Sequence, residues 1–173
     1  IPDNIEDSVL GVITGGGSCA PVEGIGWVGG QCSFLGGKGY WMITTESVTF
    51  SYDLSTLSRV KTNNLIGLTY PEGYEVLQST RQAFYFVEDI NLGGDAISNN
   101  DWVFAYHGNT LVGARQWNGK FADLPAMGSD GRWETNGYSD NGSMVTLKVL
   151  QESTGEIFKV INEIPEWEDD GLI

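Results

Sequence analysis

Histidine and basic residues are scarce in this sequence. It holds one histidine, His107, and nine lysines and arginines against 23 aspartates and glutamates, so its formal net charge is −14. A surface of this sign repels the phosphates of nucleic acids and anionic lipid headgroups. We therefore expect no nucleic acid partner. Such a surface suits cationic partners or divalent cations, or it simply keeps a secreted protein in solution.

Catalytic motifs are lacking as well. A nucleophilic triad needs a base near a serine or cysteine, and the only imidazole belongs to His107, beside Gly108 at the end of an aromatic segment. A strand-end role is the simpler interpretation of this histidine. A carboxylate pair would suit glycoside hydrolysis, but spacing in the sequence does not fix the distance between two carboxylates. We expect a protein that is not an enzyme.

Long hydrophobic runs are also missing. No apolar stretch approaches the roughly 20 residues that span a bilayer, so we expect no membrane span. The chain opens at Ile1 without a methionine and ends at Ile173 in sequence typical of the first half of a strand. We interpret it as a processed piece of a longer secreted precursor whose signal peptide has been removed.

Cysteine occurs only at Cys19 and Cys32, with a glycine-rich stretch between them. A disulfide would close this loop and stabilise the unit by roughly 3 kcal/mol. Such a bond indicates an oxidising compartment, and we expect a secreted protein, extracellular or at a cell surface. The alternative is two free thiols in a reducing cytosol. A zinc site is the weaker interpretation, because zinc needs about four ligands and His107 is far away in the sequence.

The composition favours strands and turns over helices. Glycine is common, at 24 residues, and charged residues make up only 18% of the chain. We predict a mainly β fold, an antiparallel β-sandwich preceded by a small disulfide-linked β meander with a short N-terminal helix. The weakly patterned stretch 54–74 places a boundary between a glycine-rich N-terminal subdomain, 1–70, and a sandwich domain, 71–173.

The first residues favour a helix, with an extended alternative. The spacing over 3–6 matches a capping box, and Ile5, Val9 and Val12 fall on one helical face. Against this, the β-branched residues and Gly11 weaken a helix and favour an extended segment.

Short apolar and aromatic segments predict the strands. In the first part we expect them at 26–28, 39–43 and 48–52, and in the second part at 83–92, 101–107, 110–117, 144–150 and 157–161. Gly108 and Asn109 predict a two-residue hairpin between the strands on either side of them. The stretch from 118 to 143 is expected to be a long polar loop. Short strands at this spacing indicate an antiparallel sandwich.

A series of short motifs carries a resemblance over most of the chain. The motifs are Gln82–Phe86, Asp101–Val103, Gly108–Asn109, Val112–Trp117, Pro125–Gly128 and Gly137–Tyr138, with Gly26–Gly29 and Gly39–Trp41 upstream. The series resembles an uncharacterised β module of large secreted surface proteins of Gram-negative bacteria. The resemblance implies an extracellular β module within a multidomain export product, and it supplies no catalytic residues.

Calcium is the metal that the sequence suits best, because hard cations take oxygen ligands from loops. Two loops qualify, one with Asp95 and Asp101 and the other with Asp130 and Asp140. Neither has the spacing of an EF-hand, and aspartates are also common in turns, where they bond to their own backbone. We expect no obligatory cofactor.

Three aromatic residues raise the idea of a glycan site. Trp117, Trp133 and Tyr138 lie in or near one polar loop, and flat rings of this kind stack on sugars. The alternative is that these rings build the core, with their polar atoms at its edge.

We therefore expect a non-catalytic extracellular structural or interaction module, a self-assembling subunit of a cell-surface or filamentous structure. Its partners would be other copies of itself or neighbouring domains of the precursor. The N-terminal segment or the tail 161–173 could add as a strand to a neighbouring sheet, with internal docking of both ends as the alternative. A second hypothesis is a carbohydrate-binding module of a secreted polysaccharide-degrading protein.

Overall fold

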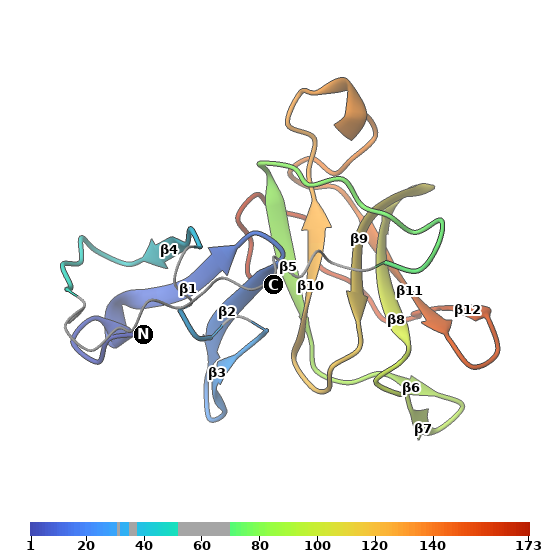
Figure 1. The fold of residues 1–173 in the computed structure, drawn as a ribbon, viewed down its shortest axis with the longest axis horizontal. Helices are drawn as coiled ribbons and strands as arrows, with labels where there is room; N and C mark the ends of the chain where they lie inside the picture. Colours follow the sequence, from blue (N-terminus) through green and yellow to red (C-terminus); the bar gives the residue numbers. More distant parts are fainter. Residues whose placement is uncertain (31, 35–37, 52–69) are drawn as a thin grey trace. The chain divides into compact units, whose positions relative to one another are not determined.

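A computed structural model describes residues 1–30, 32–34, 38–51 and 70–173 of the chain. The chain is mainly β and separates into two compact units, Ile1–Thr69 and Tyr70–Ile173 (Figure 1). The helices in the described ranges are the 3-10 turns η1 (Glu6–Ser8) and η2 (Trp133–Thr135). None of the helices found there is long and apolar enough to cross a membrane.

The N-terminal unit is built on antiparallel strands. They are β1 (Val9–Thr14), β2 (Gly17–Val22), β3 (Gly26–Val28) and β4 (Trp41–Thr44). β1, β2 and β3 follow one another as a meander, and β4 returns to the other edge of β1, which gives the order β3-β2-β1-β4. Ile5, Val9 and Val12 form a small buried cluster in this unit. The predicted β meander with its disulfide between Cys19 and Cys32 is confirmed.

The N-terminal helix is present only as the turn η1, which ends where β1 begins. From Val9 onward the chain is extended, so the helical face expected through Val12 does not form and the extended alternative holds. β-branched residues such as Val12 favour the extended conformation. In β1, Val12 pairs with Cys19 on one side and with Met42 on the other. The strand expected at 48–52 does not form over 48–51, and its last residue, with most of the expected connection 54–74, lies outside the described residues.

The C-terminal unit packs two antiparallel sheets around one core, as the sequence predicted. One sheet has the order β12-β11-β8-β9, from β8 (Trp102–His107), β9 (Thr110–Gln116), β11 (Val145–Gln151) and β12 (Glu156–Lys159). The other pairs β5 (Gln82–Val87) with β10 (Ala122–Met127). A small hairpin of β6 (Asn91–Leu92) and β7 (Asp95–Ala96) follows β5.

The hairpin at Gly108 is confirmed, and β10 is the strand that sequence reasoning missed. Gly108 adopts a φ of 58°, in the left-handed region that glycine tolerates best, and joins β8 to β9. β10 falls in the stretch 118–143 that we expected to be a loop. All six of its residues are buried, so its sequence lacks the alternation of a half-buried strand. The strand expected over 83–92 ends at Val87.

β9 and β10 approach each other closely, although they are not paired in one sheet. A Cβ atom added to Gly113 would lie 1.7 Å from the carbonyl oxygen of Pro125, so only glycine fits there. The next contact along is a buried ion pair, in which Arg115 Nη2 lies 3.2 Å from Asp123 Oδ2. Asp123 is fully buried. These contacts close one side of the sandwich.

The C-terminal segment of the chain docks on β5 as a short parallel strand. The amide of Phe84 donates to Gly171 O at 2.8 Å, and the amide of Ile173 donates to Phe84 O at 2.8 Å. Trp167 anchors the segment, because its ring is fully buried and its Nε1 donates to Ala126 O at 2.9 Å. We call residues 167–173 the tail strand.

Candidate functional site

The loop between β10 and β11, residues 128–144, carries several of the polar and aromatic residues singled out in the sequence. Asp130 organises its first half. Its carboxylate accepts hydrogen bonds from Arg132 Nε and from Thr135 Oγ1, both at 2.8 Å. The Arg132 guanidinium also forms an ion pair with it at 2.8 Å and, more than Thr135 does, holds the pKa of Asp130 well below its usual range. The loop is therefore fixed by charge-assisted hydrogen bonds.

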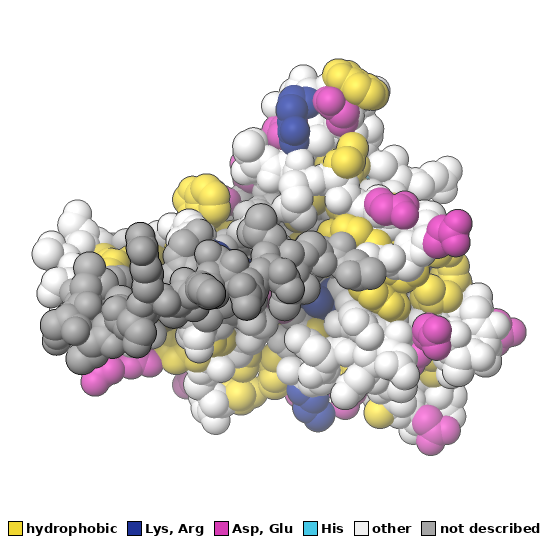
Figure 2. Space-filling model, in the orientation of Figure 1, with side chains coloured by type: hydrophobic (Ala, Val, Ile, Leu, Met, Phe, Trp, Pro, Cys, Tyr) yellow, Lys and Arg dark blue, Asp and Glu magenta, His cyan; other side chains and the backbone are white. Residues whose placement is uncertain are grey.

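Trp133 stands at the tip of this fixed loop and is 82% exposed. It begins the turn η2, which stands away from both sheets at the top of Figure 1. In Figure 2 a hydrophobic group lies at this tip together with basic and acidic side chains. An exposed tryptophan on a rigid support costs little ordering entropy when it binds, so it is a suitable anchor for a ligand.

The other two aromatic residues of the proposed glycan site lie in the core. Trp117 is 5% exposed and Tyr138 is 7% exposed. The Tyr138 hydroxyl accepts a hydrogen bond from the amide of Leu77 at 3.1 Å, which ties the loop to the segment before β5. The three rings therefore do not share an exposed face, and Trp133 alone is open to a sugar.

The second half of the loop is tied to the tail strand by Arg81. Its Nη1 lies 2.8 Å from Asp140 Oδ1, and its Nε lies 2.8 Å from Asp169 Oδ2. The guanidinium also stacks over the Trp167 ring, 5.3 Å from its centroid. Hydrogen bonds to Asp169 and then Asp140 raise the pKa of Arg81 further above its ordinary value. Asp140, a candidate calcium ligand, is thus a structural partner of an arginine.

The remaining calcium candidates are separate from one another. Asp95 is exposed in the β6–β7 hairpin. Asp101 is buried and accepts hydrogen bonds from the amides of Ser98, at 2.8 Å, and Glu152, at 3.0 Å. In the part of the chain that the structure describes, no group of three or more His, Cys, Asp or Glu residues is arranged to hold a metal ion. Asp101, Asp130 and Asp140 each accept hydrogen bonds or form ion pairs within the protein.

His107 is accounted for by a backbone contact. Its Nδ1 lies 3.0 Å from the carbonyl oxygen of Gly137, and since a carbonyl only accepts, Nδ1 is the donor. This bond joins the end of β8 to the β10–β11 loop, in keeping with a strand-end role.

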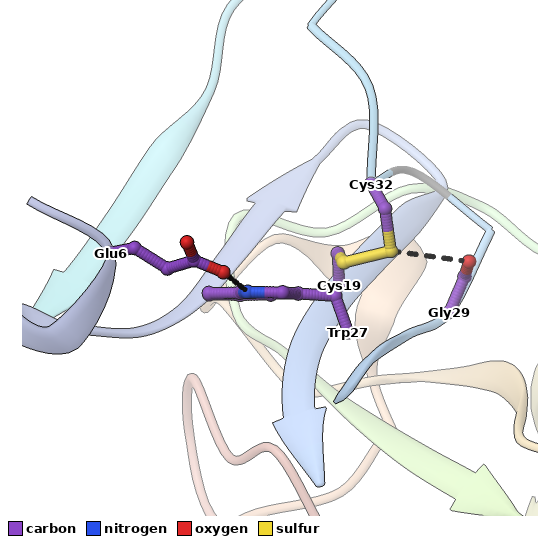
Figure 3. The surroundings of a disulfide bond; sticks show 5 residues. All are labelled: Glu6, Cys19, Trp27, Gly29 and Cys32. Carbon is purple, nitrogen blue, oxygen red and sulfur yellow. Dashed lines mark hydrogen bonds between the residues drawn. A yellow bond between two sulfur atoms is a disulfide. The ribbon is translucent and has the colours of Figure 1, made fainter. Parts of the chain in front are cut away.

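The disulfide forms between the two cysteines for which the sequence predicted it. Figure 3 shows Cys19 on β2 joined to Cys32. Their Cα atoms are 5.0 Å apart. Cys32 Sγ lies 3.5 Å from the carbonyl oxygen of Gly29. Nearby, Trp27 Nε1 donates a hydrogen bond to the Glu6 carboxylate, which links β3 to η1. The disulfide therefore ties the segment that follows β3 to β2, the central strand of the meander.

Comparison with protein-family models, with curated proteins and with solved structures finds no match to this chain. The resemblance to bacterial surface modules stays a prediction.

Proposed function

We propose that the chain is a non-catalytic structural and interaction module of an extracellular protein. It assembles with copies of itself, or with neighbouring domains, by strand addition. The observation that carries this proposal is the docking of the tail strand on β5 through backbone hydrogen bonds, made by residues more than 80 positions apart in the sequence. The disulfide supports an oxidising compartment.

The tail strand has the properties of an exchangeable element. It follows the segment 161–166, in which Ile161 is 95% exposed, and it reaches β5 as a separate piece of chain. The same hydrogen bonds and the same Trp167 pocket would form if the strand came from a second copy. Exchange between copies then needs no new contacts, only a concentration that competes with docking in the same molecule.

The test is the mass of the purified chain by light scattering over a wide concentration range, with electron microscopy of the most concentrated sample. We expect oligomers that grow with concentration. A variant that ends at Asp169 keeps the Trp167 anchor but loses the residues that pair with β5, and it should stay monomeric. Ile161→Ser, at an exposed position outside this pairing, is the matched control and should assemble normally. A monodisperse monomer of the unshortened chain at every concentration contradicts the proposal.

A second candidate, a carbohydrate-binding module, is favoured by the exposure of Trp133 on its fixed loop. In native gels that contain a polysaccharide, a glycan-binding chain migrates more slowly. Trp133→Ala should then restore normal migration. Trp41→Ala, at the 66% exposed tryptophan of the other unit, serves as the control and should leave the retardation intact. Equal migration of all three chains across a polysaccharide panel argues against this candidate.

A further inference from the structure

An apolar groove opens on the side of the C-terminal unit opposite the β9–β10 contact. It lies between β5 and the pair β11–β12, has a volume of about 610 Å³ and is lined largely by hydrophobic side chains. Those that matter for its shape are Tyr85, Val87, Leu147, Val149, Phe158 and Ile164. The volume falls within the range typical of ligand sites. The two sheets are therefore not closed against each other here.

The groove continues the line of the tail strand. Ile173 lines one end of it, where the amide of Phe86 donates to Ile173 O. Along β5 the amides of Phe84 and Phe86 both face the tail strand, and Glu88 directly follows the end of β5, two positions beyond Phe86. Glu88 also lines the groove. An extended chain placed in the groove would lie beside the edge of β5 that the tail strand uses.

The shape of the groove suits an extended chain better than a compact molecule. A second cavity, of about 350 Å³, is lined by Met144 and Leu147 and shares residues 159–162 and Ile164 with the first. Together they follow the outer part of β11. Exposed hydrophobic side chains, Met144 at 58% and Ile161 at 95%, extend this surface.

The charge around the groove favours a cationic partner. Glu88 and Asp89 line the first cavity and Glu163 lines the second, with Lys159 as the basic residue common to both. From Tyr70 to Ile173 the chain has 17 acidic and six basic residues. Five of the six bases are engaged in ion pairs or over a ring, namely Arg81, Arg115, Lys120, Arg132 and Lys148. Figure 2 shows several acidic side chains on one face of this unit.

We propose that this groove binds an extended segment of a partner protein, with apolar residues at alternate positions and lysines or arginines beside them. The segment adds as a parallel strand next to β5, in line with the tail strand, by the mode known as β-augmentation. A second copy of this chain is the poorer occupant of the groove, because the strand that it would offer, the tail strand, carries three acidic residues and no lysine or arginine. The proposal does not depend on assembly between copies.

The probe is a short fluorescent peptide in which valine and threonine alternate between pairs of lysines, titrated with the full chain and followed by anisotropy. We expect saturable binding that weakens with added salt. Two isomeric peptides carry N-methyl groups on alternate residues, in one or the other register. Only the register that removes the donors facing β5 should abolish binding, because the other set of amides faces away from the ladder.

Variants on β12 provide a matched pair. Phe158→Lys places a charge in the groove and should weaken binding at least about tenfold. Ile157→Lys, next to it on the strand and outside both cavities, should not. Since Phe158→Lys can also affect folding, Glu88→Lys at an exposed position gives an independent test and should weaken binding of the cationic peptide.

Four results overturn the proposal: no binding of the peptide, equal binding of both methylated peptides, equal binding by Phe158→Lys and Ile157→Lys when both are folded, or no loss of affinity in Glu88→Lys. A concentration-dependent dimer of the chain that Phe158→Lys abolishes would assign the groove to a second copy instead. A monomeric chain that binds the peptide would contradict assembly between copies and leave this inference standing.

Discussion

The two units of this chain are stabilised in different ways. The N-terminal unit is stabilised by one four-stranded sheet, a small buried cluster around Val9 and Val12, and a disulfide. The C-terminal unit encloses a core between two sheets, with fully buried side chains such as Phe104 and Trp167. A cross-link acts mainly by restricting the unfolded chain, whereas packing acts in the folded state. Reduction of the disulfide should therefore destabilise the N-terminal unit, and cavities made in the core should destabilise the C-terminal unit.

The largest effect should come from Trp167→Ala. It removes a fully buried ring and its hydrogen bond to Ala126 O, and we expect the C-terminal unit to lose about 3–5 kcal/mol. Urea unfolding followed by near-ultraviolet circular dichroism measures the loss. Trp133→Ala, at the exposed tryptophan, should change stability by less than about 0.5 kcal/mol. Similar losses in the two variants would mean that Trp167 is not the anchor of the tail strand.

Removal of the disulfide should act on the other unit. In the double variant Cys19→Ala and Cys32→Ala we expect the N-terminal unit to lose about 3 kcal/mol, while the unfolding of the C-terminal unit stays unchanged. Hydrogen exchange resolved along the chain separates the two. A reductant should destabilise the wild type and leave the double variant unaffected. A loss of stability in both units would contradict the conclusion that the disulfide stabilises the N-terminal unit alone.

Thr135→Val should loosen the loop that carries Trp133. The buried Thr135 hydroxyl donates to Asp130, and its loss leaves the carboxylate with one partner fewer, at a cost of about 2 kcal/mol. Hydrogen exchange over 129–139 should rise, with protection unchanged in the N-terminal unit. Thr154→Val, at an exposed turn, is a control for the loss of a threonine hydroxyl.

The smallest effect should be a pH dependence confined to the C-terminal unit. Burial raises the pKa of Tyr85 to about 12, and its hydroxyl donates to Pro165 O at 3.1 Å. Because the folded pKa lies above the unfolded value near 10, this stabilisation is complete below pH 10 and is lost as the pH rises toward 12. We expect a decrease of about 1 kcal/mol between pH 9 and pH 11. Tyr85→Phe should lack this part of the decrease, and an identical pH profile would contradict the assignment.

Sequence reasoning predicted the features that depend on local pattern. The hairpin at Gly108, the strand expected at 144–150, which forms as β11, and the disulfide all follow from neighbouring residues. Sequence reasoning failed where the burial of a segment depends on residues that are far away in the sequence. β10 is buried throughout because it lies between β5 and β9. Internal docking of the tail was one of the two expected outcomes, but no local signal indicates that its partner is β5.

The candidate site divides in the same way. The sequence identified Trp117, Trp133 and Tyr138 as one group, since they are near one loop. Only packing decides that Trp133 faces solvent and the other two enter the core. The signal that was available is that Trp133 stands between an arginine and a glutamate, whereas Trp117 ends the strand expected over 110–117.

The close approach of β9 and β10 should restrict which residues evolution accepts at this contact. Gly113 cannot acquire a side chain against Pro125 O, and two residues further on Arg115 and Asp123 depend on each other across the same two strands. Loops and surface charges can drift during evolution without disturbing either contact. Relatives too divergent for their overall sequence to align should still keep a glycine two residues before an arginine, and an aspartate two residues before a proline, on consecutive strands.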